Sequence, residues 1–272
     1  VGHSMGGLIM AGYVERTAGR RVRKAATLGT PFKGSFEAVL KMATGHSTLG
    51  DSSSREREVA RLTPALYHLL PRFQGDVSAA EGLGKDLFFA STWQTSIVET
   101  IAEQIRLRGL KGVGKTREEL VPAAEKLFQR LLQDASAHRT RVASLRLGNA
   151  GMARNDWLAI VGVGEVTRVH LEIKKADDGT PWFHLTSDDR KDGFPRGTID
   201  AHPWETGDGT VPYEGARPTF LNPEHLVCVT DDDFGYWEFR DRFLEGGLGG
   251  KSVGLHGMLP AMNVVEKLVV CH

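Results

Sequence analysis

The spacing of hydrophobic residues changes twice along the chain and divides it into three stretches. In the first, residues 8–14 are dense enough in apolar side chains to predict a largely buried helix. The apolar segment 22–28 predicts a short strand, which ends at Gly29-Thr30-Pro31. Because a turn, a helix and a strand follow one another here, this stretch is typical of an α/β sheet.

The second stretch, from about Phe36 to Ala150, has helical spacing and few strand patterns. Its predicted elements are an apolar helix at 36–43, a proline-bracketed apolar turn at 64–71, apolar residues mostly at helical spacing from 87 to 107, and an amphipathic helix whose apolar face includes 124–135. Pro122 is expected to kink the last of these helices or to mark its start. We therefore predict a helical insertion over residues 36–150.

Strand patterns return in the third stretch, after about Asn155. This stretch contains a continuous apolar run, two segments that flank a turn, a further buried-strand candidate and a closing amphipathic helix, at 158–163, 167–174 with 181–186, 225–229 and 258–270. A continuous apolar run is typical of a parallel strand that is buried on both faces. The sequence thus predicts a mostly parallel α/β core built from residues 1–35 and 151–272.

The charges of the 272-residue chain balance, with 34 Lys and Arg against 34 Asp and Glu. Zero net charge argues against partners that need a bulk positive field, such as nucleic acid or an anionic membrane surface. No apolar run approaches the roughly 20 residues of a transmembrane helix. The two cysteines, Cys228 and Cys271, provide neither a disulfide framework nor a CxxC zinc pair. This low cysteine content weakly favours a reducing compartment such as the cytoplasm. The rest of the sequence does not indicate where the protein resides.

One motif near the start of the chain carries a specific chemistry. Gly2-His3-Ser4-Met5-Gly6 fits G-x-S-x-G, the nucleophile elbow, in which a tight strand-to-helix turn exposes a serine hydroxyl at a helix N-terminus. Glycines flank such a serine because side chains there would clash, and Gly7 adds a second close-packing glycine. The backbone N–H of Met5 can donate to a developing oxyanion. We predict Ser4 as a nucleophile; the alternative is a glycine-rich turn before a helix.

A serine of this kind needs an acid and then a histidine base later in the chain. The acid candidate is Asp208, between glycines in the GDGTVP segment, although Asp-Gly also occurs in plain surface turns. Three histidines follow it. We favour His256, in a loop just before the last helix, over His225, which begins a predicted strand, and over the terminal His272. This chemistry needs no metal and no organic cofactor.

Five sequence blocks extend the pattern over the whole chain. They are GHSMGG, TLGTPFKGS, PALYHLLP, GDGTVP and LHGMLPAM, which begin at residues 2, 27, 64, 207 and 255. In this order they resemble the lecithin:cholesterol acyltransferase-like branch of the α/β-hydrolases, a branch that includes phospholipases and bacterial lipase-like proteins. The last two blocks are much more specific than the elbow.

The resemblance implies an α/β-hydrolase fold with Ser4 as nucleophile, Asp208 as acid and His256 as base. It also implies that the 36–150 insertion is a cap over an acyl-chain site. Members of the branch cleave ester bonds in lipids, and some pass the acyl group to an alcohol. The expected partners are therefore a lipid or other ester and an alcohol acceptor.

The chain departs from the family pattern in three ways. The disulfides of the secreted animal members are absent, the spacing from Asp208 to His256 is long, and residues 230–242 read as an insertion between them. In addition, an elbow serine normally follows several strands and the loop that supplies a second oxyanion donor. We therefore expect the chain to be the C-terminal portion of a larger enzyme. On that expectation, it is a poor catalyst by itself and exposes an unpaired sheet edge.

Other motifs compete with this interpretation. Gly109–Thr116 matches the phosphate-binding P-loop, with Lys115 as its lysine, but a predicted helix precedes it where a P-loop requires a strand. Thr116 and Glu119 can instead form a capping box for the next helix. The acidic runs at 188–189 and 231–233 lack the spaced ligands of a calcium loop. The aromatic residues Phe88, Phe89 and Trp93 can line an acyl pocket, although a place in the core of the cap is favoured.

Three rival functions stay open at this point. The first is a peptidase or a hydrolase of small esters, which has the same machinery and a different substrate. The second is a truncated or inactive hydrolase-fold protein that serves as a binding module. The third is a nucleotide hydrolase that depends on Lys115.

Overall fold

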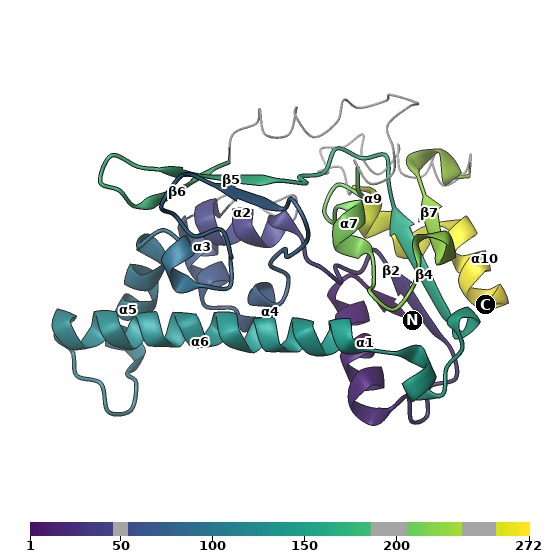
Figure 1. Ribbon diagram of the computed structural model, residues 1–272, viewed down its shortest axis with the longest axis horizontal. Helices are drawn as coiled ribbons and strands as arrows, with labels where there is room; N and C mark the ends of the chain where they lie inside the picture. Colours follow the sequence, from purple (N-terminus) through teal and green to yellow (C-terminus); the bar gives the residue numbers. More distant parts are fainter. Residues whose placement is uncertain (46–53, 186–205, 236–253) are drawn as a thin grey trace. The chain divides into compact units, whose positions relative to one another are not determined.

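The computed structural model describes residues 1–45, 54–185, 206–235 and 254–272, which form two compact units (Figure 1). Unit 1 comprises the described parts of Val1–Gly34, Thr140–Val169 and Arg190–His272. Unit 2 comprises those of Ser35–Arg139 and His170–Asp189. This division differs from the predicted one at the end of the insertion, because the boundary falls at residue 139 and the predicted hairpin belongs to unit 2.

Unit 1 is built on a four-stranded parallel sheet. Its strands are β1 (Gly2–His3), β2 (Ala25–Leu28), β4 (Trp157–Gly162) and β7 (Leu226–Val229), in the spatial order β1-β2-β4-β7. All four residues of β2 and five of the six in β4 are buried. Strands that are covered on both faces need apolar residues throughout, which explains the continuous apolar runs in the sequence. Because all the strand pairs of this sheet are parallel, the predicted α/β class with a mostly parallel sheet is confirmed.

Helices cover both faces of this sheet. Ile160 of β4 packs into one apolar cluster with residues of α9 (Leu255–Met258) and α10 (Asn263–Cys271), and Figure 1 shows α10 beside the strands. The next residue of β4, Val161, points to the opposite cluster, which includes Tyr213 and Ala216 of α7 (Tyr213–Ala216). Neighbouring residues of a strand face opposite sides, so β4 anchors both layers.

The helix that follows β1 is α1 (Met5–Thr17), longer than the predicted segment 8–14. Its buried residues Gly7, Leu8, Ala11 and Val14 recur at the spacing of one helical face. The helix ends at Ala18, which adopts the left-handed conformation with φ of 51°. Its N–H donates to the carbonyl of Glu15 in the last turn.

Unit 2 combines helices with a small mixed sheet. Its helices are α2 (Phe36–Thr44), α3 (Ser54–Arg61), α4 (Pro64–Tyr67), α5 (Ser96–Arg108) and the part of α6 (Arg117–Ser144) up to residue 139. Its strands are β3 (Val77–Ala79), β5 (Leu171–Lys175) and β6 (Pro181–His184), in the order β3-β5-β6. The β5–β6 pair is the predicted antiparallel hairpin, whereas β3 was not predicted and pairs with β5 in parallel.

Short 3₁₀ turns connect the larger elements. They are η1 (Ala90–Thr92), η2 (Leu147–Ala150), η3 (Arg154–Asp156), η6 (Pro223–His225), η7 (Asp231–Asp233) and η8 (Leu259–Ala261).

The core of unit 2 is rich in aromatic rings. Tyr67 packs edge-on against Phe128, and Trp93 packs against the same phenylalanine. The Tyr67 hydroxyl donates to the carbonyl of Arg61 at 2.6 Å. The guanidinium of Arg61 is itself buried and donates to the carbonyls of Met42 and Ser96. Burial lowers the pKa of Arg61 to about 10, and its carbonyl partners replace the water it has lost.

Two details of the helices in unit 2 refine the predicted elements. The helix predicted directly before the P-loop match is present as α5, which begins at Ser96. The earlier part of the 87–107 region contains η1, after which the Trp93 indole N–H donates to the carbonyl of Leu87. Pro122 lies inside α6 and does not mark its start, since the helix begins at Arg117. The carbonyl that the missing Pro122 N–H leaves unpaired belongs to Glu118, an exposed residue, so water can satisfy it.

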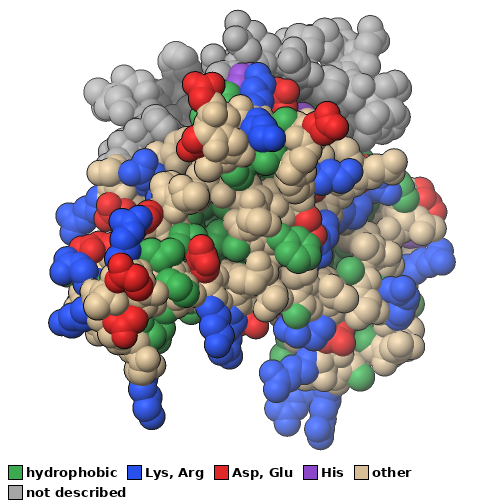
Figure 2. Space-filling model, turned by 60° about the vertical axis from the view of Figure 1, so that its left-hand side comes forward, with side chains coloured by type: hydrophobic (Ala, Val, Ile, Leu, Met, Phe, Trp, Pro, Cys, Tyr) green, Lys and Arg blue, Asp and Glu red, His purple; other side chains and the backbone are tan. Residues whose placement is uncertain are grey.

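The surface carries both signs of charge. On the left-hand part of the face in Figure 2, Lys and Arg side chains lie among Asp and Glu. Ion pairs such as Arg106–Glu103 and Arg117–Glu99 occur on the helices of unit 2. None of the described helices is long and apolar enough to cross a membrane. The long helix α6, for example, carries charged residues at both ends.

We predict that Phe128→Ala destabilises unit 2 by about 3–5 kcal/mol, because Phe128 is fully buried and its loss leaves a cavity beside Tyr67 and Trp93. The matched control is Phe89→Ala, which removes a ring that is 56% exposed and is expected to cost less than ~1 kcal/mol. Urea unfolding followed by tryptophan fluorescence measures both. Equal losses for the two variants would contradict this account of the core.

Candidate functional site

Ser4 occupies a strained turn between β1 and α1. Its φ of 52° and ψ of −128° are unusual for a residue other than glycine. Its N–H donates to the carbonyl of Leu28 at 2.9 Å, and its carbonyl accepts from the Gly7 N–H at 3.1 Å. Although Ser4 is the N-cap of α1, its side chain does not cap the helix. The hydroxyl is therefore available for another partner.

The glycines around Ser4 allow the strand and the helix to meet. A Cβ on Gly2 would lie 2.8 Å from the Cα of Gly7, and a Cβ on Gly7 would overlap the buried Thr30 side chain. Gly6, by contrast, has nothing within 4 Å of such a Cβ. The expected close packing is thus present at Gly2 and Gly7, and the expected clash at Gly6 is wrong.

The structure brings Ser4, His256 and Asp208 together in one hydrogen-bonded chain. Ser4 Oγ lies 3.0 Å from His256 Nε2, and His256 Nδ1 lies 2.7 Å from Asp208 Oδ2. Asp208 is 1% exposed and His256 is 4% exposed. A carboxylate only accepts hydrogen bonds, so His256 Nδ1 carries the proton and Nε2 is free to accept from the Ser4 hydroxyl.

Asp208 is held by the backbone of its own turn. Its Oδ1 accepts from the N–H groups of Thr210 at 3.0 Å and Val211 at 2.7 Å. The N–H of Gly209 donates to the Thr167 hydroxyl, which fixes the turn to a neighbouring segment. These donors compensate the buried carboxylate for the water it has lost. The Asp-Gly sequence here forms a buried acceptor site and not a plain surface turn.

The three candidate histidines have different surroundings. His256 lies in the first turn of α9, and its N–H donates to the carbonyl of Asp208 at 3.0 Å, so the expectation of a loop position is corrected to a short helix. His225 ends η6, with its Nδ1 3.6 Å from Glu224 Oε1. The carbonyl of the terminal His272 accepts from Lys24 Nζ. Of the three, His256 contacts Ser4 and Asp208.

Two further glycines, each at the end of a strand, lie against the Asp208–His256 pair. The sequence analysis did not identify either of them as a site residue. Gly29 follows β2 with φ of 53°, and a Cβ there would lie 2.8 Å from Asp208 Oδ2 and 3.0 Å from His256 Nδ1. Gly162 ends β4, and a Cβ there would lie 2.6 Å from the Cβ of Asp208. The Asp208–His256 pair therefore occupies space that these residues leave open.

His3 also contacts the site and was treated in the sequence as a variable position of the motif. Its Nε2 lies 2.8 Å from the carbonyl oxygen of His256, and the two rings are 4.9 Å apart. Burial lowers the pKa of His3, against the opposing effect of its backbone hydrogen bond.

The predicted oxyanion donor, Met5, is the first residue of α1. The N–H groups of a helix's first turn have no acceptor within the helix. The helix dipole also favours negative charge at this end. Met5 directly follows Ser4, so its N–H belongs to this group of donors.

The P-loop match has the wrong surroundings for a nucleotide site. Gly109–Thr116 follows helix α5, and a P-loop follows a buried strand. Thr116 is the residue before α6, where its N–H and hydroxyl both contact Glu119 Oε2, at 3.3 and 2.8 Å. One half of the predicted capping box is thus present, since Glu119 accepts from the Thr116 N–H. The other half differs, because the Thr116 hydroxyl donates to Glu119 and the Glu119 N–H donates to the Thr116 carbonyl.

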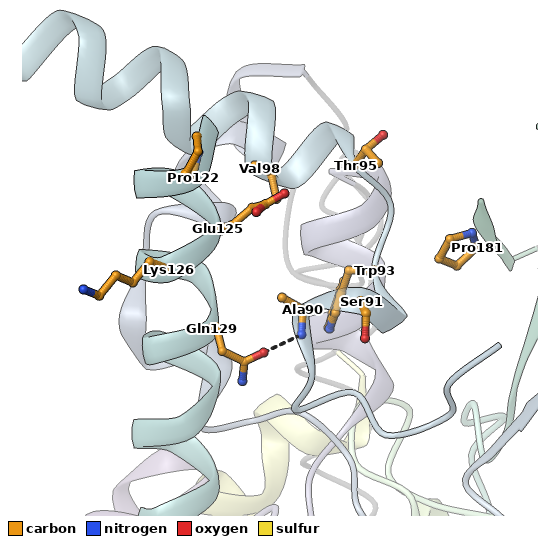
Figure 3. A pocket seen from close by; sticks show the side chains of 10 residues that line it. All are labelled: Ala90, Ser91, Trp93, Thr95, Val98, Pro122, Glu125, Lys126, Gln129 and Pro181. Atoms are coloured by element: carbon orange, nitrogen blue, oxygen red, sulfur yellow. Dashed lines mark hydrogen bonds between the residues drawn. The ribbon is translucent and has the colours of Figure 1, made fainter. Parts of the chain in front are cut away.

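The aromatic residues considered for an acyl pocket separate into two groups. Phe88 and Trp93 belong to the buried core of unit 2, whereas Phe89 is exposed. Trp93 also lines a cavity of about 560 Å³ in unit 2. Figure 3 shows that Gln129 lies on α6 at this cavity, where its side-chain oxygen accepts from the Ala90 N–H at 2.9 Å. The cavity wall mixes apolar and polar side chains.

The acidic runs form no ion site in the part of the chain that the structure describes. Asp231–Asp233 form η7, where Asp233 accepts from the Thr230 N–H at 2.7 Å. Residues 188–189 and the later part of the 230–242 segment lie outside the described residues. Within the described ranges, no three His, Cys, Asp or Glu side chains gather as a metal site would need.

Comparison with known proteins supports the fold. No protein-family model matches the chain, and no curated protein matches it. Among solved structures, it is similar to a chain described as "The crystal structure of Tle4-Tli4 complex", with a TM-score of 0.53 and 16% identity. The match covers 83% of this chain and 51% of that one, so the chain spans about half of its relative's length. At this identity the likeness concerns the fold, which is α/β with a mostly parallel sheet.

We predict that Gly29→Ala disrupts the Asp208–His256 hydrogen bond. The added Cβ would press on both side chains, and a left-handed alanine costs roughly 1–2 kcal/mol more. The proton NMR signal of the His256 Nδ1–H is expected to shift or vanish. The matched control is Gly151→Ala, at a φ of 66° with nothing within 4 Å of a Cβ, which has the same backbone cost without the contact. A Gly29→Ala signal identical to that of the control would refute this steric argument.

Proposed function

We propose that this protein is a serine-dependent acyl-transfer enzyme of the α/β-hydrolase type that acts on carboxylic esters, most of all lipid esters. The observation that supports this best is the hydrogen-bonded chain from Ser4 Oγ through His256 to Asp208, with distances of 3.0 and 2.7 Å. The order of the three residues along the chain is also that of α/β-hydrolases. The likeness in fold to a solved structure agrees with this class.

In the first half of the proposed reaction, an ester is converted to an acyl-serine. Ser4 Oγ attacks the carbonyl carbon while its proton moves to His256 Nε2. Asp208 accepts from His256 Nδ1–H and stabilises the imidazolium that forms. The Met5 N–H donates to the oxyanion of the tetrahedral intermediate. The intermediate collapses as His256 returns the proton to the leaving alcohol, which departs.

In the second half, the acyl group leaves the serine by the reverse chemistry. His256 takes a proton from water or from an acceptor alcohol, whose oxygen attacks the acyl carbon. The resulting intermediate releases Ser4, which regains its proton from His256. Water gives a carboxylic acid and an alcohol gives a new ester. The charge on His256 and Asp208 returns to its starting state, so the cycle needs no cofactor.

The lipid class rests on the resemblance of five sequence blocks to lecithin:cholesterol acyltransferase-like proteins. In that family the segment between the elbow and the later strands is a cap, and we assign this role to unit 2 as part of the proposal. Unit 2 has a buried core of aromatic and aliphatic side chains of its own, as a separate cap would need.

A second candidate keeps the fold without the reaction, as a binding module. The hydrogen-bonded state of Ser4 favours the enzyme, because a hydroxyl held 3.0 Å from an imidazole is poised for proton transfer. The strained Ser4 backbone also favours it, since strain of this kind persists where function requires it.

We predict that Ser4→Ala removes both esterase activity and covalent labelling by a fluorophosphonate probe, with the unfolding temperature unchanged. His256→Ala is expected to lower the rate by at least about 10³-fold, because the proton acceptor is lost. His225→Ala is the matched histidine control and is expected to keep the activity. Mass spectrometry of the labelled peptide identifies the modified residue. Labelling that survives in Ser4→Ala, or loss of activity in His225→Ala with retention in His256→Ala, would overturn the assignment.

Ester chain length separates the lipid class from its rivals. For a lipid hydrolase, kcat/KM on p-nitrophenyl esters is expected to rise about tenfold for every two added methylenes until the acyl site is filled, since each buried methylene contributes roughly 0.8 kcal/mol. A rate that is flat or falls with chain length points to small esters, and cleavage of amides at comparable rates points to a peptidase.

A further inference from the structure

His3 joins the two chain segments that carry Ser4 and His256. It lies in β1 directly before Ser4, and its Nε2 is 2.8 Å from the main-chain oxygen of His256. The two residues are 253 positions apart in sequence. A carbonyl oxygen only accepts, so His3 Nε2 carries a proton and donates it.

With this contact, both the main-chain N–H and the main-chain carbonyl of His256 are hydrogen-bonded. On one side, the His256 N–H donates to the carbonyl of Asp208 at 3.0 Å. On the other side, the His256 carbonyl accepts from His3. The imidazole is held in turn by Asp208 Oδ2 and Ser4 Oγ. The hydrogen bond from His3 is thus the one contact among these four that links the base's backbone to the strand that positions the nucleophile.

The surroundings of His3 favour a neutral ring that donates a hydrogen bond. Three ionisable groups meet here: His3, His256 at a ring distance of 4.9 Å, and Asp208 behind it. Burial favours the neutral ring of His3. A neutral His3 can donate to the His256 carbonyl without adding a second positive charge next to the imidazolium that forms during catalysis.

We infer that His3 is a positioning residue, which holds the backbone of His256 through its Nε2–H and so sets the distance between His256 Nε2 and Ser4 Oγ. The inference rests on the proposed function, since it assigns His3 a part in the Ser4 reaction. A misplacement of about 1 Å can cost 10²-fold in rate, so the loss of this bond is expected to lower kcat more than it changes KM.

The test compares His3→Gln with His3→Asn, which carry the same amide on side chains that differ by one methylene. The glutamine amide reaches about as far as His Nε2, and the asparagine amide falls short of the His256 carbonyl. We expect His3→Asn to lower kcat on a short p-nitrophenyl ester by roughly 10- to 100-fold, with KM within about twofold. His3→Gln is expected to stay within about threefold of the wild type, as is the control His225→Asn outside the site.

The outcomes separate the inference from the proposed function. If the wild type hydrolyses the ester and reacts with the fluorophosphonate at Ser4 but His3→Asn matches it, the positioning role is wrong and the proposed function stands. A rise in KM with unchanged kcat, or equal losses in both amide variants, also overturns the role. If the wild type is inert at Ser4, the proposed function fails and the inference fails with it. Should His3→Asn have a lowered unfolding temperature, His3→Phe, which keeps a ring without the donor, repeats the comparison.

Discussion

The buried hydrogen bond between His256 and Asp208 is the interaction on which the rest of the site depends. Asp208 is a carboxylate with almost no exposure, and its stability there requires donors for both oxygens. The backbone N–H groups of Thr210 and Val211 serve one oxygen, and His256 Nδ1 serves the other. Because Nδ1 is thereby committed as a donor, the tautomer of His256 is fixed and Nε2 faces Ser4.

The parallel sheet supplies the geometry for this bond. Ser4 follows β1, Gly29 follows β2 and Gly162 ends β4, so all three lie at the same edge of neighbouring strands. The carboxyl ends of parallel strands are where α/β proteins assemble their sites. The absence of a Cβ at Gly29 and Gly162 leaves the room that the Asp208–His256 pair fills.

The sequence was informative where a local rule governs the structure. Ser4, Asp208 and His256 could be selected because an elbow and a glycine-bracketed aspartate have recognisable neighbours, and the structure brings these three side chains together. His3 and Gly29 escaped because their contacts lie more than 150 positions away in sequence, which no local pattern reports. Strand β3 escaped for a similar reason, since three residues that pair with β5 have no periodicity to detect.

The chain returns to unit 2 after it has contributed to unit 1. β3 is part of Ser35–Arg139, and its partner β5 belongs to His170–Asp189, so the strand β4 of unit 1 is synthesised between them. Unit 2 therefore cannot complete its sheet until most of the parallel sheet of unit 1 has also emerged. Synthesis of the two units is therefore interleaved along the chain. For the same reason, deleting one continuous segment cannot remove the whole of unit 2 and leave unit 1 complete. Removing unit 2 requires two separate deletions, one for each of its segments.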